Sequence, residues 1–288
     1  MMQTFNIKTG LVLEGGAMRG IFSAGIIDVL MENGFAFPAL VGVSAGAAFG
    51  CNYKSNQPGR ALRYNLRYCR EPKYCSFRSL VKTGDIFGAE FCYHAIPEKL
   101  DPFAVNAFAN NPMAFYVVCT DVETGKPHYQ RIDRVEDDCY EWIRASASMP
   151  LVSRIVEVGG GKYLDGGVAD SIPLAFAETI CPRNMVVLTR PRDYVKEPAN
   201  MLLFRHSLRK YPHMLEAVRN RHVMYNAQRD YVFAQEKAGK ALVLCPDAPL
   251  TIGRIEHQRE KIQQTYDLGR QLALSRLDEI RGFIEDGH

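Results

Sequence analysis

Residues 39–46 read Ala39-Leu40-Val41-Gly42-Val43-Ser44-Ala45-Gly46, an apolar run that ends in a serine between small residues. The run predicts a buried strand, and the small residues after it predict the start of a helix. Ser44 therefore lies in a G-x-S-x-G pattern at a strand-to-helix turn, where Gly42 and Gly46 give the chain room to turn and the hydroxyl is exposed. The sequence predicts a nucleophile at Ser44. A serine that only caps the following helix is the alternative.

A second turn of small residues precedes this one in the chain. It follows the apolar run of residues 10–14 and consists of Gly15, Gly16, Ala17, Met18, Arg19 and Gly20. Consecutive small residues let backbone N–H groups point into a shared space, as binding of an oxyanion requires. We therefore predict an oxyanion hole formed by Gly15, Gly16 and Ala17. Arg19 is expected either to brace the turn or to contact a substrate phosphate.

The same turn is close to the dinucleotide-binding pattern G-x-G-x-x-G. That pattern requires an acidic residue at the end of the second strand, where it holds the ribose. In this chain the second predicted strand ends in Ser44 instead. The sequence therefore argues against a bound dinucleotide.

A third motif lies more than 100 residues later. Asp165 follows the short apolar run of residues 162–164 and is followed by Gly166 and Gly167. A carboxylate at a strand end is a candidate base for an activated serine. The alternative is an aspartate that only shapes a turn, where this residue is common.

The order of the predicted elements indicates an α/β fold with a mainly parallel central sheet. Strands and helices alternate at the start of the chain, and such strands are joined by right-handed crossovers. Further strands are predicted at 114–120, 127–132, 184–189 and 242–245, and helices at 21–32, 60–70, 139–148, 200–238 and 255–284. We expect one domain over 1–288, with the motifs in a core at about 10–190 and residues 200–288 packed onto it.

Composition limits the class of protein. The chain has 47% apolar and 23% charged residues, which is ordinary for a globular protein. The polar first residues do not resemble a secretory signal, and no run approaches the roughly 18 apolar residues of a spanning helix. We expect a cytoplasmic protein, soluble or peripheral to the inner face of the membrane. The eight cysteines form no zinc-binding pattern, so we expect reduced thiols and no metal site.

The positive charge is local. The net charge of +3 is too small to indicate a nucleic-acid partner, but residues 200–240 hold eight Lys or Arg against three Asp or Glu. Residues 60–70 also place Arg60, Arg63, Arg67 and Arg70 on one helical face. These stretches are expected either to contact anionic lipid headgroups at a membrane surface or to be ordinary solvated faces. The oligomeric state is not predicted.

The three motifs in this order resemble those of the patatin-like phospholipases, over roughly residues 10–190. The stretches 120–121 and 145–150 also fit bacterial members of that family. The resemblance implies a three-layer α/β/α fold and hydrolysis of phospholipid or lysophospholipid esters by a Ser44–Asp165 dyad, with no cofactor. Two residues depart from the family's usual Asp-Gly-Gly-Gly turn, because Glu14 stands in place of the aspartate and Ala17 in place of the last glycine.

Three further alternatives stay open. A histidine is the usual base for a serine nucleophile, and His128, on a predicted hairpin, is the least implausible of the seven histidines. A thioesterase or acyltransferase would use the same motifs, because the acyl-serine step is common to all three activities. A lipid-binding protein without activity is a rival of another class.

Overall fold

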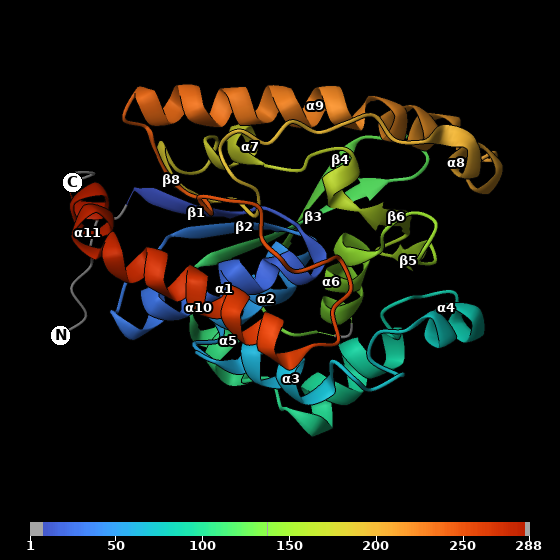
Figure 1. Cartoon of the computed structure of the whole chain (residues 1–288), viewed down its shortest axis with the longest axis horizontal. Coiled ribbons are helices and arrows are strands. Elements are labelled where there is room, and N and C mark those ends of the chain that lie inside the picture. Colours follow the sequence, from blue (N-terminus) through green and yellow to red (C-terminus); the bar gives the residue numbers. More distant parts are fainter. Residues whose placement is uncertain (1–7, 137, 286–288) are drawn as a thin grey trace.

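The computed structural model describes residues 8–136 and 138–285, and its centre is an eight-stranded sheet (Figure 1). Seven strands follow the order β5-β6-β3-β2-β1-β7-β8, and β4 pairs with β3 off this path. The strands are β1 Thr9–Leu13, β2 Ala39–Val43, β3 Ala114–Asp121, β4 Pro127–Ile132, β5 Val156–Val158, β6 Gly161–Asp165, β7 Arg183–Val187 and β8 Ala241–Leu244. The five strands from β8 to β3 are parallel to one another, so the expected mainly parallel sheet is confirmed.

Helices cover both faces of the sheet and complete three layers (Figure 1). One face carries α1 Gly20–Glu32, α2 Ala45–Lys54, α3 Arg60–Tyr68, α6 Cys139–Ala147 and α10 Arg259–Ser275. The other face carries α7 Leu174–Ala177 and the long α9 Pro212–Lys237. The remaining helical segments are η1 Ala17–Arg19, α4 Phe77–Thr83, η2 Phe91–Leu100, α5 Val105–Asn110, η3 Gly166–Val168, α8 Met201–Ser207 and α11 Leu277–Glu285.

The central strands are apolar because both of their faces are covered. All residues of β1 and β2 are buried. Successive side chains of a strand point to opposite faces. Leu11 and Leu13 accordingly pack in the core under α1 and α2, whereas Val12 packs in the core under α9. A strand buried on both faces reads as a continuous apolar run, which is why both strands were predictable.

The strand register brings the predicted motifs to one edge of the sheet. Leu13 of β1 pairs with Gly42 of β2, so the turns that follow these strands are neighbours. Val43 of β2 pairs with Val118 of β3, and the next residue of β3, Cys119, pairs with Asp165 of the antiparallel β6. Ser44 and Asp165 therefore meet although 121 positions separate them in the sequence.

The helices depart from the predicted ranges in several places. The predicted helix at 255–284 is two helices, α10 and α11. At the break between them, the Arg276 side chain donates hydrogen bonds to the Val243 carbonyl of β8 and to Glu279. Three segments, α4, η2 and α5, lie in a stretch for which no element was predicted.

The C-terminal segment closes the fold by a close contact between α1 and α10. A Cβ atom added to Gly25 of α1 would overlap the carbonyl oxygen of Tyr266, and one added to Gly269 of α10 would overlap that of Phe22. Tyr266 also donates a hydrogen bond to Asp28, and Arg270 forms an ion pair with Glu32. The two backbones can approach this closely only because both helices have a glycine at the crossing.

We predict that Gly269→Ala destabilises the protein by about 1–3 kcal/mol, because the methyl group must displace the backbone of α1. Gly282→Ala is the matched control, since nothing lies within 4 Å of a Cβ there and alanine favours a helix. Urea unfolding followed by circular dichroism measures both variants. If residues 1–288 fold as the single domain that we propose, each variant unfolds in one transition. Equal stabilities of the two variants would contradict the close crossing.

Candidate active site

Ser44 occupies the sharp turn between β2 and α2. Its φ of +55° is unusual for a residue with a side chain, and such strain is typical of functional turns. The backbone N–H of Ser44 donates to the Ser146 hydroxyl at 2.8 Å, and this hydroxyl donates to the Val118 carbonyl oxygen at 2.6 Å. The Ser44 hydroxyl donates to the Asp165 carboxylate, with 2.7 Å between Oγ and Oδ2. The turn thus fixes the hydroxyl against a carboxylate.

Asp165 is held from several sides at the end of β6. Its Oδ1 accepts a hydrogen bond from the Gly167 N–H at 2.7 Å, and its carbonyl oxygen accepts one from the Thr120 hydroxyl at 2.8 Å. Burial raises the pKa of the Asp165 carboxyl above its ordinary value, although the charge of Arg221 and the bonds from Ser44 and Gly167 oppose the shift. A carboxylate with a raised pKa is a better proton acceptor.

The turn at residues 15–17 faces the same space. Glu14 anchors it, because its carboxylate accepts hydrogen bonds from the Tyr225 hydroxyl at 2.6 Å and from the N–H and hydroxyl of Thr189. Ala17 takes a left-handed conformation with a φ of +49°. Within the described residues, the N–H groups of residues 15–17 have no hydrogen-bond acceptor. They are therefore available to an oxyanion.

Close backbone approach explains the other small residues of the motifs. A Cβ atom at Gly46 would overlap the Leu13 carbonyl oxygen, and one at Gly166 would overlap that of Val118. At five other glycines an added Cβ atom would also lie too close to a neighbour. These pairs are Gly15 and Ser44, Gly16 and Thr189, Gly20 and Ala45, Gly42 and the Gly46 carbonyl oxygen, and Gly167 and Arg221. These glycines let the two turns and the strand end with Asp165 pack against one another.

Two cavities meet at Ser44. An apolar cavity of about 110 Å³ extends beneath α2 toward η2, and its lining includes Phe49, Tyr93, Ile96 and Ile143. An open cleft of about 580 Å³ extends on the other side of Ser44, between the glycine turn, the segment after β7 and α9. Ala17, Ser44 and Met149 line both cavities. The serine hydroxyl therefore lies between an apolar cavity and a cleft whose lining also includes charged side chains.

The Arg19 side chain lines the cleft and makes no hydrogen bond to the turn within the described residues, although the Arg19 backbone N–H donates to the Gly16 carbonyl oxygen. Its Nε atom is buried and has no hydrogen-bond partner among residues 8–136 and 138–285. Burial and the nearby Arg190 lower the pKa of Arg19 to about 10. The Arg19 guanidinium thus lies at the cleft, and neither of the two roles expected for it is tested by these contacts.

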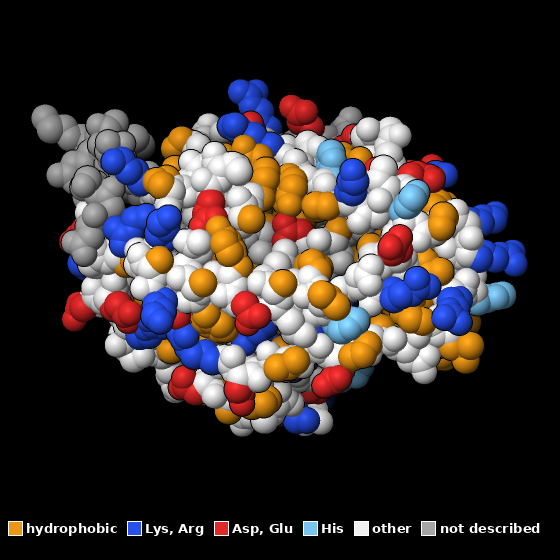
Figure 2. All heavy atoms as spheres, turned by 90° about the horizontal axis from the view of Figure 1, so that it is seen from above, with side chains coloured by type: hydrophobic (Ala, Val, Ile, Leu, Met, Phe, Trp, Pro, Cys, Tyr) orange, Lys and Arg blue, Asp and Glu red, His pale blue; other side chains and the backbone are white. Residues whose placement is uncertain are grey.

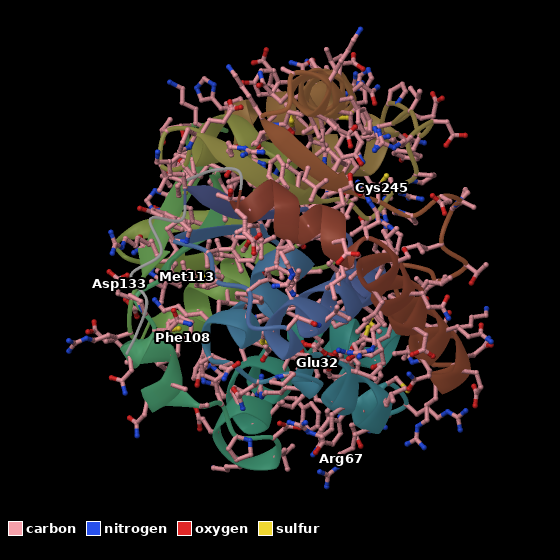
Figure 3. The ribbon with its side chains drawn as sticks, turned by 90° about the vertical axis from the view of Figure 1, so that its left-hand side faces the viewer. Glu32, Arg67, Phe108, Met113, Asp133 and Cys245 are labelled. Atoms are coloured by element: carbon pink, nitrogen blue, oxygen red, sulfur yellow. The ribbon has the colours of Figure 1, made fainter. Side chains whose placement is uncertain are left out.

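The predicted arginine stripe is not a single solvent-facing surface. Arg60 is 4% exposed and donates to Asn52 and to the Asp101 carbonyl oxygen. Arg63 forms an ion pair with the Asp101 carboxylate at 2.7 Å. Arg67, further along α3, is exposed at the edge of the molecule (Figure 3). The first two arginines thus fix the loop that holds Asp101.

The remaining candidates lie away from Ser44. His128 stacks on Trp142 with 5.1 Å between ring centroids and contacts Gln130, so it is not placed to act on the Ser44 hydroxyl. The eight cysteines are not joined by disulfides. No group of three His, Cys, Asp or Glu side chains suited to a metal occurs in the described part of the chain. No described helix is long and apolar enough to cross a membrane.

Comparison with known proteins identifies the family. The model of the patatin-like phospholipases matches residues 11–177, which is more than half of the chain. The chain belongs to the patatin-like phospholipase family. Residues 11–177 are called the patatin segment below. A second model, for a domain of unknown function named DUF6363, matches residues 211–285, which include α9, β8 and α10.

Relatives of this chain occur in bacteria and fungi. The uncharacterized protein YjjU of Escherichia coli is 30% identical over 186 residues, which cover 63% of this chain and 51% of that protein. The lysophospholipase nte1 of Aspergillus oryzae is 26% identical over 57% of this chain and 10% of its own length. This chain thus spans about half of YjjU and a smaller share of nte1. VipD from Legionella pneumophila aligns over 94% of this chain and 67% of its own chain, with a TM-score of 0.47 and 13% identity.

Several residues of the site were not predicted from the sequence. Ser146 lies in a stretch noted only for its resemblance, and Thr189, Arg221 and Tyr225 lie outside all three motifs. Arg221 and Tyr225 are four residues apart, so they share one face of α9. The four-residue spacing could have indicated that both side chains face the same site, but α9 has many pairs of residues with this spacing.

We predict that Asp165→Asn raises the free energy of unfolding relative to the native chain. The folded state holds the pKa of Asp165 above its value in the unfolded chain, so the native chain loses stability as the pH rises between these two values. The variant with asparagine does not lose stability in this way as the pH rises. The asparagine amide can still accept the hydrogen bond from the Gly167 N–H and donate one to Ser44. Urea unfolding across a pH series measures the difference. An advantage of the variant that grew as the pH fell would contradict the raised pKa.

Proposed function

We propose that the chain is a lipid acyl hydrolase that cleaves carboxylic esters of phospholipids or lysophospholipids through an acyl intermediate on Ser44. The main support is the 2.7 Å hydrogen bond between Ser44 Oγ and Asp165 Oδ2, at the point where the apolar cavity meets the cleft. Membership in the patatin-like phospholipase family supports the same activity.

In the first step Asp165 accepts the Ser44 proton while Oγ attacks the ester carbonyl carbon. The carbonyl oxygen becomes an oxyanion, which accepts hydrogen bonds from N–H groups of Gly15, Gly16 and Ala17. Each such donor is worth about 100- to 1,000-fold in rate, because its dipole is fixed before the charge develops. The intermediate collapses to an acyl-Ser44 ester, and the leaving alcohol takes the proton from Asp165.

In the second step a water molecule attacks the acyl-Ser44 carbonyl carbon, and Asp165 accepts a proton from that water. The second tetrahedral intermediate releases the fatty acid, and the proton returns to Ser44 Oγ. Asp165 acts alone as base and acid in this scheme. Its raised pKa suits both roles, since the two protonation states then differ less in free energy near neutral pH.

The two cavities suit the two halves of a lipid ester. The cavity under α2 is lined mainly by apolar and aromatic side chains, which favour an acyl chain. The leaving group would then lie in the cleft, whose lining includes charged side chains such as Arg19, Arg190 and Arg254. Arg60 lies at the cavity wall, with its guanidinium 5.4 Å from the Tyr64 ring centroid and 5.3 Å from that of Phe103.

We predict that Ser44→Ala and Asp165→Asn each lower kcat for ester hydrolysis by about 1,000-fold or more, because the nucleophile and its base act as a unit. Mass spectrometry of fatty acids released from phospholipids and lysophospholipids measures this loss. Ser275→Ala, a change of an exposed serine on α10, is the control and should retain full activity.

A serine-reactive phosphonate gives an independent readout, since it should label the native chain on Ser44 and leave Ser44→Ala unlabelled. Release of fatty acid that survives Ser44→Ala would refute the mechanism. Cleavage of acyl thioesters but of no oxygen ester would favour the thioesterase or acyltransferase alternative. No labelling and no release would favour a lipid-binding protein.

We further propose that the protein works in the cytoplasm and contacts the inner face of the membrane through α8. Leu202 and Leu203 of this helix are 74% and 68% exposed, and Phe204 lines the cleft. Arg205, Arg209 and Lys210 are exposed beside them, and Figure 2 shows basic side chains with apolar ones between them at this end of the molecule. Exposed apolar residues together with basic ones favour an anionic lipid surface.

We predict that Leu202→Ser with Leu203→Ser weakens binding to anionic vesicles by about tenfold or more, because two apolar side chains no longer enter the bilayer. Leu268→Ser with Leu274→Ser on α10 is the matched control, since these leucines are also about half exposed. Vesicle sedimentation measures binding, and hydrolysis of a water-soluble ester should be equal in both variants. Equal loss of vesicle binding in both would contradict a contact through α8.

A further inference from the structure

The cleft beside Ser44 contains an unusual number of cationic side chains. They come from η1, from the segment after β7, from α9 and from the loop after β8, and they are Arg19, Arg190, Lys196, Arg221 and Arg254. Only Arg19 belongs to the patatin segment. The other four are therefore a contribution of this chain's later residues, outside the part that matches the family.

The carboxylates in the cleft offset the charge of these cations only in part. Three carboxylates line the cleft, namely those of Glu14, Asp165 and Glu197. Glu14 is bound by Tyr225 and Thr189, and Asp165 is bound by Ser44 and Gly167, while Glu197 is exposed. Within the described residues none of the five cations forms an ion pair. The cleft thus has an excess of positive charge.

Other contacts hold the cations in place. The Arg221 Nε donates to the Gly167 carbonyl oxygen, next to Asp165. The Lys196 ammonium lies 4.6 Å from the Tyr225 ring centroid, and the Arg190 guanidinium lies 4.4 Å from that of Tyr194. Cation–π contacts of this kind orient a cation without neutralising it. The cluster is therefore arranged in advance to receive an anion.

The cations also destabilise one another. Burial and the charges of Arg221 and Arg254 lower the pKa of Lys196 to about 7. Like charges in a partly buried cleft repel each other more strongly than in water. An anion bound among them would relieve this repulsion, so its binding would be favoured by the whole cluster.

We propose that Arg190, Lys196, Arg221 and Arg254, together with Arg19, form a subsite for the phosphate of an anionic headgroup on the substrate's leaving alcohol. The proposal rests on the proposed acyl hydrolase function, because it assigns the cleft to the leaving group. The acyl chain enters the cavity under α2 and the ester lies at Ser44, so the headgroup phosphate reaches the cleft a few bonds beyond the ester.

The subsite favours a headgroup that has no positive charge of its own. A phosphomonoester or a phosphoglycerol adds only negative charge to the cleft. A phosphocholine or phosphoethanolamine also brings an ammonium group. The carboxylates of Glu14 and Asp165 are already bound, so Glu197 alone of the three cleft carboxylates could meet it, against five cations that repel it. The rings of Tyr194 and Tyr225 already face Arg190 and Lys196. The geometry therefore selects anionic acyl esters over zwitterionic ones.

The subsite is tested first by binding. The full chain with Ser44→Ala is titrated with inorganic phosphate and with glycerol 3-phosphate by calorimetry. We expect one site for each, and at least tenfold weaker binding when Lys196→Gln and Arg254→Gln are added. Adding Arg219→Gln and Lys237→Gln instead, on the exposed surface of α9, is the matched control and should leave binding unchanged. No binding of either compound, or equal loss in both variants, would overturn the subsite.

The second arm tests the headgroup in the active protein. Two lysolipids with the same acyl chain, one with a phosphomonoester and one with a phosphocholine headgroup, are compared as monomers in solution, so that membrane contact plays no part. The native chain should have a higher kcat/KM for the phosphomonoester, and Lys196→Gln with Arg254→Gln should lower this ratio at least tenfold. Equal kcat/KM values would overturn the headgroup assignment and leave a site for free phosphate. If neither lysolipid is cleaved, the hydrolase function fails, whereas the titration still decides the anion subsite.

Discussion

The pairing of β3 with both β2 and β6 holds the two halves of the dyad together. Ser44 follows a residue of β2 that pairs with Val118, and Asp165 pairs with Cys119, the next residue of β3. The distance between nucleophile and base is thus set by backbone hydrogen bonds of a buried sheet. The sheet also sustains two unfavourable features, a serine with a φ of +55° and a buried carboxylate. Strain of this kind costs about 1–3 kcal/mol and persists only in a rigid surrounding.

The segment after residue 190 takes part in both the core and the site. Its α10 packs on α1, and its β8 extends the sheet beyond β7. Tyr225 of α9 binds the carboxylate of Glu14, which stands where the family usually has aspartate. The longer glutamate side chain reaches both α9 and Thr189 at the end of β7. Glu14, which departs from the family's usual residue, is therefore bound by a side chain outside the patatin segment, that of Tyr225.

The sequence was sufficient to predict the strands that are buried on both faces and the motifs that need glycine. The apolar runs at β1, β2 and β7 are covered on both faces, so their patterns are unambiguous. Arg60 was wrongly expected on a surface stripe. The spacing of the arginines cannot show that Arg60 contacts Asp101, which lies 41 residues later in the sequence. Arg221 and Arg254 were missed for the same reason, since each reaches the cleft through tertiary packing. No prediction covered α4 and η2. The segment η2 packs against α6, and a tertiary contact of this kind can outweigh local preference.

The crossing of α1 with α10 has a consequence for the synthesis of the chain. Gly25 and Tyr266 meet across almost the whole sequence, and the bond from Tyr266 to Asp28 joins residues 238 positions apart. At 5–20 residues per second, α1 would wait roughly 10–50 s on the ribosome before its partner is made. During that time the part of its surface that packs against α10 is uncovered, although α1 is one of the first elements to emerge. The last quarter of the chain therefore completes the packing of the first quarter.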